Sequence, residues 1–289
     1  MGFYTRTSFR IFGMFSDNLG IFFPELGDDI KRAGMQISTD EYISIGVMTS
    51  ALVLLLEVPL LSFIFGFLFK STLISVLTGI TASVALSVLI FYLSTKYPKA
   101  VMGDRSKKID AMLPFASLFL STISATRLPL DKVFKIFGEK SRYGELTKQI
   151  QVMNTDIEVF GLDINTALKR AVDRSPSKQM REMLWGVLST SIAGGDVSRY
   201  LREKAEDQMD DYRRSVEQFS HKMTLYIEVY LTAIIIGAIF FLILTSLFSG
   251  IAGIGGNILV LQGLIIFVFL PLVSAIFLLL IKVSSPAGE

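Results

Sequence analysis

Residues 158–172, EVFGLDINTALKRAV, combine a glycine, an acidic residue and an amphipathic run in one short stretch. Gly161 suits the left-handed conformation that commonly follows the last turn of a helix. The Asp163 carboxylate suits the start of the next helix, where it accepts exposed backbone N–H groups. Apolar residues then recur at three- and four-residue spacing, which is typical of an amphipathic helix. The stretch therefore predicts a tight elbow between two helices.

The same pattern occurs three times along the central region. LPLDKVFKIF from Leu128 and GDVSRYLREK from Gly195 align with LDINTALKRA from Leu162, at spacings of 34 and 33 residues. Proline at a first helical turn loses no hydrogen bond, so it replaces aspartate at the first elbow. The predicted elbow residues are Pro129, Gly161, Asp163, Gly194, Gly195 and Asp196. Three elbows predict six helices, near residues 106–126, 129–141, 143–160, 163–174, 176–193 and 196–222.

A period of 33–34 residues is also that of a tetratricopeptide array. The Trp, Tyr and Pro positions of that repeat are missing here. The sequence therefore favours a compact six-helix bundle.

Four apolar blocks flank this region. They cover residues 42–69, 73–93, 225–248 and 258–281. Each exceeds the roughly 20 residues that a helix needs to cross a bilayer. Within hydrocarbon the backbone polar groups must be paired inside the segment, so each block is predicted to be a helix. The fold class is therefore an all-α integral membrane protein, with two transmembrane hairpins flanking the bundle.

Lysine and arginine predict the orientation. Residues 96–224 carry 22 of the 28 basic residues, and the loop SGIAGIGGN of the second hairpin carries none. The positive-inside rule then places both termini and the central region in the cytoplasm of a multi-pass cell (cytoplasmic) membrane protein. The predicted parts are an amphipathic arm (1–41), a first hairpin (42–94), a cytoplasmic bundle (95–224), a second hairpin (225–282) and a cytoplasmic tail (283–289).

The N-terminal arm has its own signals. FRIFGMF, from Phe9, is predicted to lie on the membrane surface with its aromatic face towards the lipid. Ser38 and Glu41 have the spacing of a capping box directly before the first span.

Two carboxylates lie within the apolar blocks. Glu57 is deep in the first block, next to Pro59, which frees a backbone carbonyl and is expected to kink the helix. Glu228 is near the cytoplasmic end of the third block, where its side chain can snorkel to the interface. Ionisable groups inside a membrane mark function by default, so Glu57, Pro59 and Glu228 are candidate functional residues.

No catalytic constellation is visible. The chain has one histidine and no cysteine, and it lacks both a P-loop and metal-ligand spacing. A non-enzymatic protein without a cofactor and without nucleic-acid binding is therefore expected. Acidic and basic residues interleave over 199–214, which is either a solvated helix face or a docking surface for a partner. The candidate docking residues are Arg199, Arg202, Asp210, Asp211, Arg213 and Arg214.

Four stretches together resemble one family, the type II secretion system F proteins. They are IKRAGMQISTDEYISI (30–45), LPFASLFLSTISATRLPLDKVF (113–134), VFGLDINTALKRAV (159–172) and IEVYLTAIIIG (227–237). The length and single F domain are most similar to Tad-type members. One departure is Arg127-Leu128 at the first elbow, where the family commonly has a glycine.

The resemblance implies a platform protein of a type IV filament or secretion machine. Such a protein docks a cytoplasmic ATPase, couples it to pilin subunits in the bilayer, and forms a homo-oligomer or a hetero-oligomer with a paralogous platform protein. The residues leave one alternative open, a small polytopic transporter or channel that uses Glu57.

Overall fold

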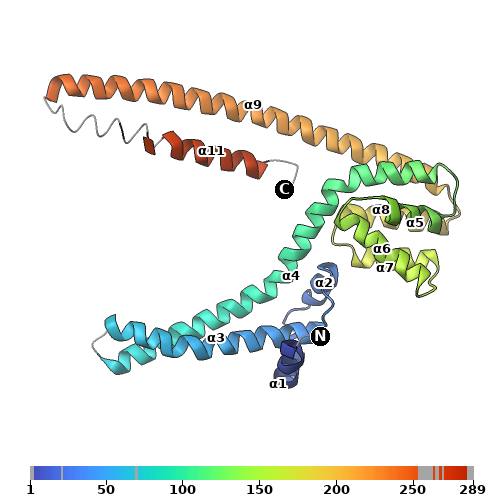
Figure 1. Ribbon diagram of the computed structural model, residues 1–289, viewed down its shortest axis with the longest axis horizontal. Helices are drawn as coiled ribbons and strands as arrows, with labels where there is room; N and C mark the ends of the chain where they lie inside the picture. The colour runs from blue at the N-terminus through green and yellow to red at the C-terminus, as the bar shows by residue number, and fades with distance from the viewer. Residues whose placement is uncertain are drawn as a thin grey trace. The chain divides into compact units, whose positions relative to one another are not determined.

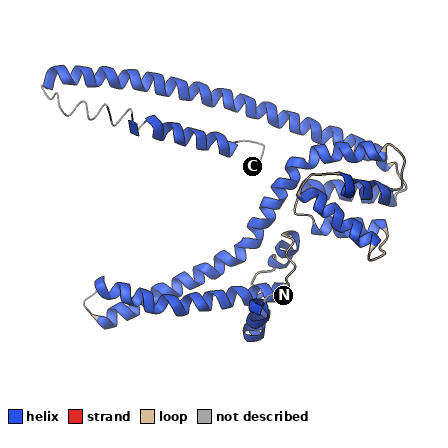
Figure 2. Ribbon diagram, in the orientation of Figure 1, coloured by secondary structure: helices blue, strands red, loops and turns tan. Residues whose placement is uncertain are grey.

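The computed structural model describes residues 3–20, 22–68, 71–252, 263, 267–268 and 270–284. Throughout these ranges the regular structure is helical, and they contain no strand (Figure 2). The predicted all-α class is therefore confirmed. The chain divides into two compact units, residues 1–202 and 203–289.

The first unit contains the arm, the first hairpin and the bundle (Figure 1). Its helices are α1 (Phe3–Gly20), α2 (Leu26–Arg32), α3 (Thr39–Leu68), α4 (Thr72–Ser124), α5 (Leu130–Lys140), α6 (Glu145–Glu158), α7 (Ile164–Arg174), α8 (Lys178–Ile192) and the first residues of α9 (Val197–Ala252). The second unit contains the rest of α9 and α11 (Leu270–Ser284).

Small residues hold α3 against α4 in the first hairpin. A Cβ atom built on Gly79 would lie 2.5 Å from the Ser62 Oγ atom, so the two backbones approach closely there. The Ser87 hydroxyl donates to the Ser50 carbonyl oxygen at 2.9 Å. Close packing of small residues and hydroxyl hydrogen bonds are the usual contacts between helices in lipid, where apolar surface drives no association.

The second span and the first bundle helix form one helix. The sequence predicted separate helices over 73–93 and 106–126, but α4 continues through both for 53 residues. Pro98 and Pro114 lie inside α4 without ending it. Proline is a common cause of bends, and α4 changes direction along its length (Figure 1).

The bundle closes around one apolar core. Its most deeply buried large side chains include Leu113 and Leu120 from α4, Phe134 and Phe137 from α5, and Leu168 from α7. Helices α6, α8 and the start of α9 complete it with Ile150, Met153, Met183, Leu184 and Leu201. The predicted helices 129–141, 143–160, 163–174 and 176–193 are confirmed as α5 to α8, each with ends within two residues of the expectation.

The arm packs against the hairpin. The hydroxyl groups of Tyr4 on α1 and Thr49 on α3 form a hydrogen bond at 3.0 Å. The capping box is formed: the Glu41 N–H donates to the Ser38 Oγ atom at 3.2 Å, and the Ser38 N–H donates to a Glu41 carboxylate oxygen at 3.1 Å. Two of the N–H groups at the start of α3 thus gain a partner.

In the second unit α9 contains the third predicted span. The sequence predicted a helix near 196–222 and an apolar block over 225–248, and α9 (Val197–Ala252) includes both in one helix that passes through Gly237. Tyr230 of α9 stacks on Phe277 of α11, with ring centroids 4.6 Å apart, and its hydroxyl group bonds with that of Ser274 at 2.8 Å.

Three of the four predicted spans are helices that are long and apolar enough to cross a membrane. They belong to α3, α4 and α9. The fourth block, 258–281, lies within the described residues only at 263, 267–268 and in α11, and the tail beyond Ser284 lies outside them.

Candidate functional site

The three elbows share one backbone geometry. At each elbow, a residue with positive φ lies two positions before the N-cap residue of the following helix. These residues are Arg127 at 58°, Gly161 at 66° and Gly194 at 68°. Arg127 is the one non-glycine residue with positive φ in the part of the chain that is described. The departure from glycine noted in the sequence is therefore absorbed by arginine in a left-handed conformation.

Aspartate caps the helices at two elbows. The Asp163 carboxylate accepts the Thr166 N–H at 3.0 Å, and the Asp196 carboxylate accepts the Arg199 N–H at 3.1 Å. The hydrogen bonds from Thr166 lower the pKa of Asp163, because they favour its charged form. Pro129 occupies the equivalent position at the start of α5.

Contacts between neighbouring helices bring the elbows to one end of the bundle. Lys132 at the start of α5 lines one small pocket together with Glu158 at the end of α6, and Lys135 in the middle of α5 pairs with Glu158 at 2.7 Å. The Ser191 hydroxyl at the end of α8 donates to the Asn165 side chain at the start of α7, at 3.2 Å. The start of α5 therefore lies beside the end of α6, and the start of α7 beside the end of α8.

Apolar side chains are exposed at each elbow. Leu128 is 42% exposed at the first elbow, Val159 and Phe160 are 71% and 67% exposed at the second, and Ile192 is 68% exposed at the third. We call these four residues the elbow cluster. Exposed apolar residues gathered at one end of a domain are a common sign of an interaction surface.

Within the predicted docking face on α9, several charges pair along their own helix. Arg213 forms an ion pair with Asp210 at 3.3 Å, and Arg214 pairs with Asp211. The hydrogen bond that Arg214 donates to Asp211 raises the pKa of Arg214. Arg199 and Arg202, which belong to the first unit, are exposed. Pairs three residues apart on an exposed helix are typical of a solvated face, so the docking role of these residues stays a prediction.

Glu57 lies in α3, with its Oε2 atom inaccessible to solvent and without a hydrogen-bond partner among the described residues. Pro59 follows within the same helix and is exposed. A buried carboxylate oxygen without a hydrogen-bond donor is costly, which favours a partner from another helix or another chain. Glu228 differs, because its side chain is exposed on α9.

An arginine that sequence reasoning missed links the arm to the bundle. The Arg105 Nη1 atom donates to the Arg32 carbonyl oxygen at the end of α2, at 3.2 Å, and its Nε atom donates to Glu145 on α6, at 3.0 Å. A Cβ atom on Gly34 would lie 2.1 Å from that Nη1 atom. Hydrogen bonds from Lys148 and then from Arg105 lower the pKa of Glu145. We call Arg105, Glu145 and the end of α2 the arm clamp.

Two further polar contacts were missed. Asp156 is 4% exposed and pairs with Arg174 at 2.5 Å. The Ser177 hydroxyl donates to Asp110, and Ser177 also caps α8 by accepting the Met180 N–H at 3.0 Å. A signal for Asp156 was present, because it falls between Met153 and Ile157 on the apolar face of its helix. Asp110 and Ser177 are far apart in sequence, and no local pattern joins them.

No group of three acidic or histidine side chains suited to a metal ion occurs in the described ranges. The elbow cluster, the arm clamp and Glu57 are the candidate functional features of the described residues.

Comparison with known proteins identifies the bundle. Residues 116–245 match the family model for type II secretion system (T2SS), protein F. The matched segment begins in α4, ends in α9 and contains all three elbows. The bundle is therefore similar to a type II secretion system F domain, in line with the sequence resemblance.

Two archaeal relatives share about half of the chain. An uncharacterized protein of Methanocaldococcus jannaschii, MJ1286, is 25% identical over 145 residues, which is 50% of this chain and 24% of that protein. Flagella accessory protein J of the same organism is 23% identical over 149 residues, which is 51% of this chain and 26% of that protein. The chain thus spans about a quarter of the length of the curated relatives that it matches. No solved structure matches it.

Proposed function

We propose that this chain is a membrane platform protein of a type IV filament machine, a pilus or a secretion system. In this role it docks a cytoplasmic ATPase and couples that ATPase to the movement of pilin subunits. It acts as a homo-oligomer or together with a paralogous platform protein in the cytoplasmic membrane. The observation that carries the proposal is the type II secretion system F match over 116–245, in a bundle whose first and last helices continue into apolar spans. The similarity to a flagella accessory protein supports it. Tad-type membership remains part of the proposal.

The first test is copurification of the full chain with the ATPase of the same filament system. Recovery of the ATPase supports docking, and its absence from membranes that contain both proteins at normal levels contradicts it. We expect Phe160→Ser in the elbow cluster to reduce recovery of the ATPase severalfold. Trp185→Ser is the matched control, because Trp185 is another exposed aromatic residue of the bundle at 56% exposure. Arg213→Glu with Arg214→Glu tests the charged face of α9 in the same assay.

The coupling step has its own test in α9. A continuous helix passes movement along its axis, whereas a flexible joint absorbs it. Three glycines inserted after Ser220 lower helix propensity by roughly 1 kcal/mol per residue relative to alanine. We expect that insertion to leave membrane insertion and ATPase binding intact and to abolish filament assembly. Three alanines inserted at the same position keep the helix and separate loss of continuity from the added length. Normal filaments from the glycine variant would remove α9 from the coupling path.

A second candidate function is a transporter or channel that uses Glu57. The unpaired Oε2 atom of Glu57 favours it, because proton carriers need a carboxyl group that changes its protonation state inside the membrane. Proton-dependent flux through the purified chain in liposomes would support this function if Glu57→Gln abolishes the flux. A platform protein gives no flux, tolerates Glu57→Gln and loses complex assembly with Glu57→Leu.

A further inference from the structure

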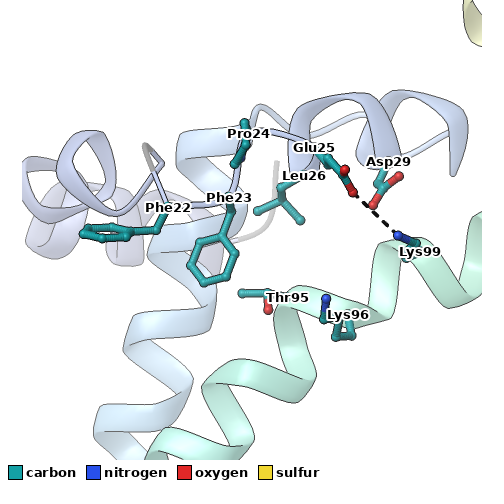
Figure 3. A pocket seen from close by; sticks show the side chains of 9 residues that line it. All are labelled: Phe22, Phe23, Pro24, Glu25, Leu26, Asp29, Thr95, Lys96 and Lys99. Atoms are coloured by element: carbon teal, nitrogen blue, oxygen red, sulfur yellow. Dashed lines mark ion pairs between the residues drawn. The ribbon is translucent and has the colours of Figure 1, made fainter.

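A cavity lies where the first hairpin meets the arm. Its volume is about 250 Å³, and residues of the segment 22–29 face residues of α4 across it (Figure 3). Thr95, Lys96 and Lys99 line it from α4, and Phe22, Phe23, Pro24, Glu25, Leu26 and Asp29 line it from the arm. The Phe23 ring meets Phe91 edge to face, with centroids 6.1 Å apart, and so anchors the arm side of the cavity to the hairpin.

The residues around the cavity have the pattern that is typical of the headgroup level of a bilayer. The apolar run of the second span ends at Leu93, and Lys96 and Lys99 are the first cations after it. Tyr92 and Tyr97 are 51% and 59% exposed at the same level, as in the aromatic belts at membrane interfaces. The Lys96 Nζ atom lies 5.4 Å from the centre of the Tyr92 ring.

The cavity is lined by two cationic and two anionic side chains. Lys99 and Glu25 form an ion pair at 3.6 Å, with side chains 56% and 82% exposed. An exposed pair of this length contributes little to stability, so a ligand can displace it. Lys96 and Asp29 form no ion pair with any described residue. Two ammonium groups therefore face two carboxylates across a small space (Figure 3).

Apolar surface continues from the cavity along α4. Leu89 and Leu93 are 50% and 57% exposed. Leu93 lies three residues before Lys96 and Leu89 four residues before Leu93, so the three side chains share one helix face. Phe22, at 75% exposure, lies at the rim on the arm side. Acyl chains can run along this surface while a polar headgroup fills the cavity.

We propose that this cavity binds the headgroup of a phospholipid that carries both a phosphate and a primary amine. The phosphate binds Lys96 and Lys99, because ammonium groups attract phosphate as point charges. The amine binds Glu25 and Asp29. The lipid thereby ties the arm to the cytoplasmic end of the first hairpin, independently of any ATPase or filament subunit.

The test is native mass spectrometry of the full chain in detergent, titrated with phosphatidylethanolamine, phosphatidylglycerol and inorganic phosphate. We expect phosphatidylethanolamine to bind most tightly. Lys96→Gln with Lys99→Gln should weaken its binding by about tenfold or more, the effect of losing a charge-assisted hydrogen bond. Glu25→Gln with Asp29→Asn should remove the preference for phosphatidylethanolamine over phosphatidylglycerol.

Lys107→Gln with Lys140→Gln is the matched control, since it removes the same charge from exposed positions of the bundle. The thermal midpoint without added lipid verifies that each variant is folded. Unchanged binding by the Lys96 and Lys99 variant, or equal binding of the two phospholipids to the wild type, overturns the proposal. Inorganic phosphate that displaces the lipid at equal concentration makes the cavity a free-phosphate site and also overturns it.

Discussion

Arg127 occupies the position that glycine takes at the other two elbows. Its φ of 58° costs an L-residue roughly 1–2 kcal/mol, because the Cβ atom crowds the following carbonyl group. The side chain is exposed and forms no ion pair with described residues. The first elbow therefore keeps the shape of the other two at a cost in stability.

Arg127→Gly should relieve that cost. Glycine loses about 0.5–1 kcal/mol through its greater freedom in the unfolded chain, so the expected net gain is roughly 0.5–1 kcal/mol. Thermal unfolding of the full chain in detergent should show a midpoint raised by about 2 °C. Arg142→Gly is the control: Arg142 is an exposed loop residue whose φ is negative, so that change should lower the midpoint slightly. A lower midpoint for Arg127→Gly would mean that the arginine side chain makes a stabilising contact.

The arm clamp should make the stability of the protein depend on pH in the acidic range. The pKa of Glu145 is lowered from its ordinary value of 4.5 by Lys148 and then by Arg105. A carboxyl group with a lowered pKa in the folded state stabilises the protein above its ordinary pKa, and that contribution is lost as the pH falls below it. Glu145→Gln should therefore flatten the decline in thermal midpoint between about pH 5 and about pH 3. Glu139→Gln, at an exposed residue of α5, should leave the decline unchanged.

The helix caps could be predicted from residues that are close together in the sequence. Asp163, Asp196 and the capping box of Ser38 and Glu41 act through neighbours within four positions, so their roles can be recognised in the sequence. Arg105 could not be recognised in this way. Its partners, Arg32 and Glu145, lie 73 and 40 positions away and are brought together by the tertiary fold.

At the scale of elements, the first hairpin depends on the small residue where α3 and α4 approach most closely. A methyl group at Gly79 would lie 2.8 Å from the Ser62 Cα and N atoms, and a backbone cannot yield as a flexible side chain does. Gly79→Ala should destabilise the hairpin by about 1–3 kcal/mol. The midpoint of thermal unfolding in nanodiscs measures this.

Gly103→Ala on the same helix is the matched control. A Cβ atom there meets no atom within 4 Å, and alanine raises helix propensity by up to about 1 kcal/mol. The two alanine substitutions in α4 should therefore have opposite signs. An unchanged thermal midpoint for Gly79→Ala would show that the two helices can move apart at no cost in stability.

The length of α4 was the least predictable feature of the elements. The sequence predicted a helix end after the second span, because a change of composition often marks an end. The structure has no end there. Pro98 is tolerated inside α4, a long helix whose other turns remain hydrogen-bonded.

At the scale of the whole molecule, the orientation in the membrane is still a prediction from the lysine and arginine bias. The chain has no cysteine, so a single introduced cysteine is the one thiol that the reagent can label in this protein. Ser71, between α3 and α4, and Arg142, between α5 and α6, are both exposed. A membrane-impermeant thiol reagent on intact cells should label Ser71→Cys and spare Arg142→Cys.

Permeabilised cells provide the control for that experiment, since both thiols should then react. Labelling of Arg142→Cys alone in intact cells would invert the topology and place the helical bundle outside the cytoplasm. An inverted topology would also exclude a cytoplasmic ATPase as the partner of the elbow cluster.

The architecture was predictable because two strong sequence signals occur in separate parts of the chain. Continuous apolar runs predicted the spans, and the repeated elbow predicted the bundle. The candidate site was less predictable. The sequence singled out charges on α9 that pair along their own helix, whereas Val159, Phe160 and Ile192 are exposed only because of how the elbows turn.

The continuity of α4 has a consequence for how the bundle forms during synthesis. Starting a helix in water is unfavourable by a factor on the order of 10⁻³, whereas each added residue extends it at almost no cost. The apolar half of α4 leaves the ribosome first and becomes helical in lipid, where an unpaired backbone is not tolerated. The polar half then grows from an existing end and presents Leu113 and Leu120 as the first wall of the core. The bilayer thus acts as the nucleus for folding a water-exposed domain.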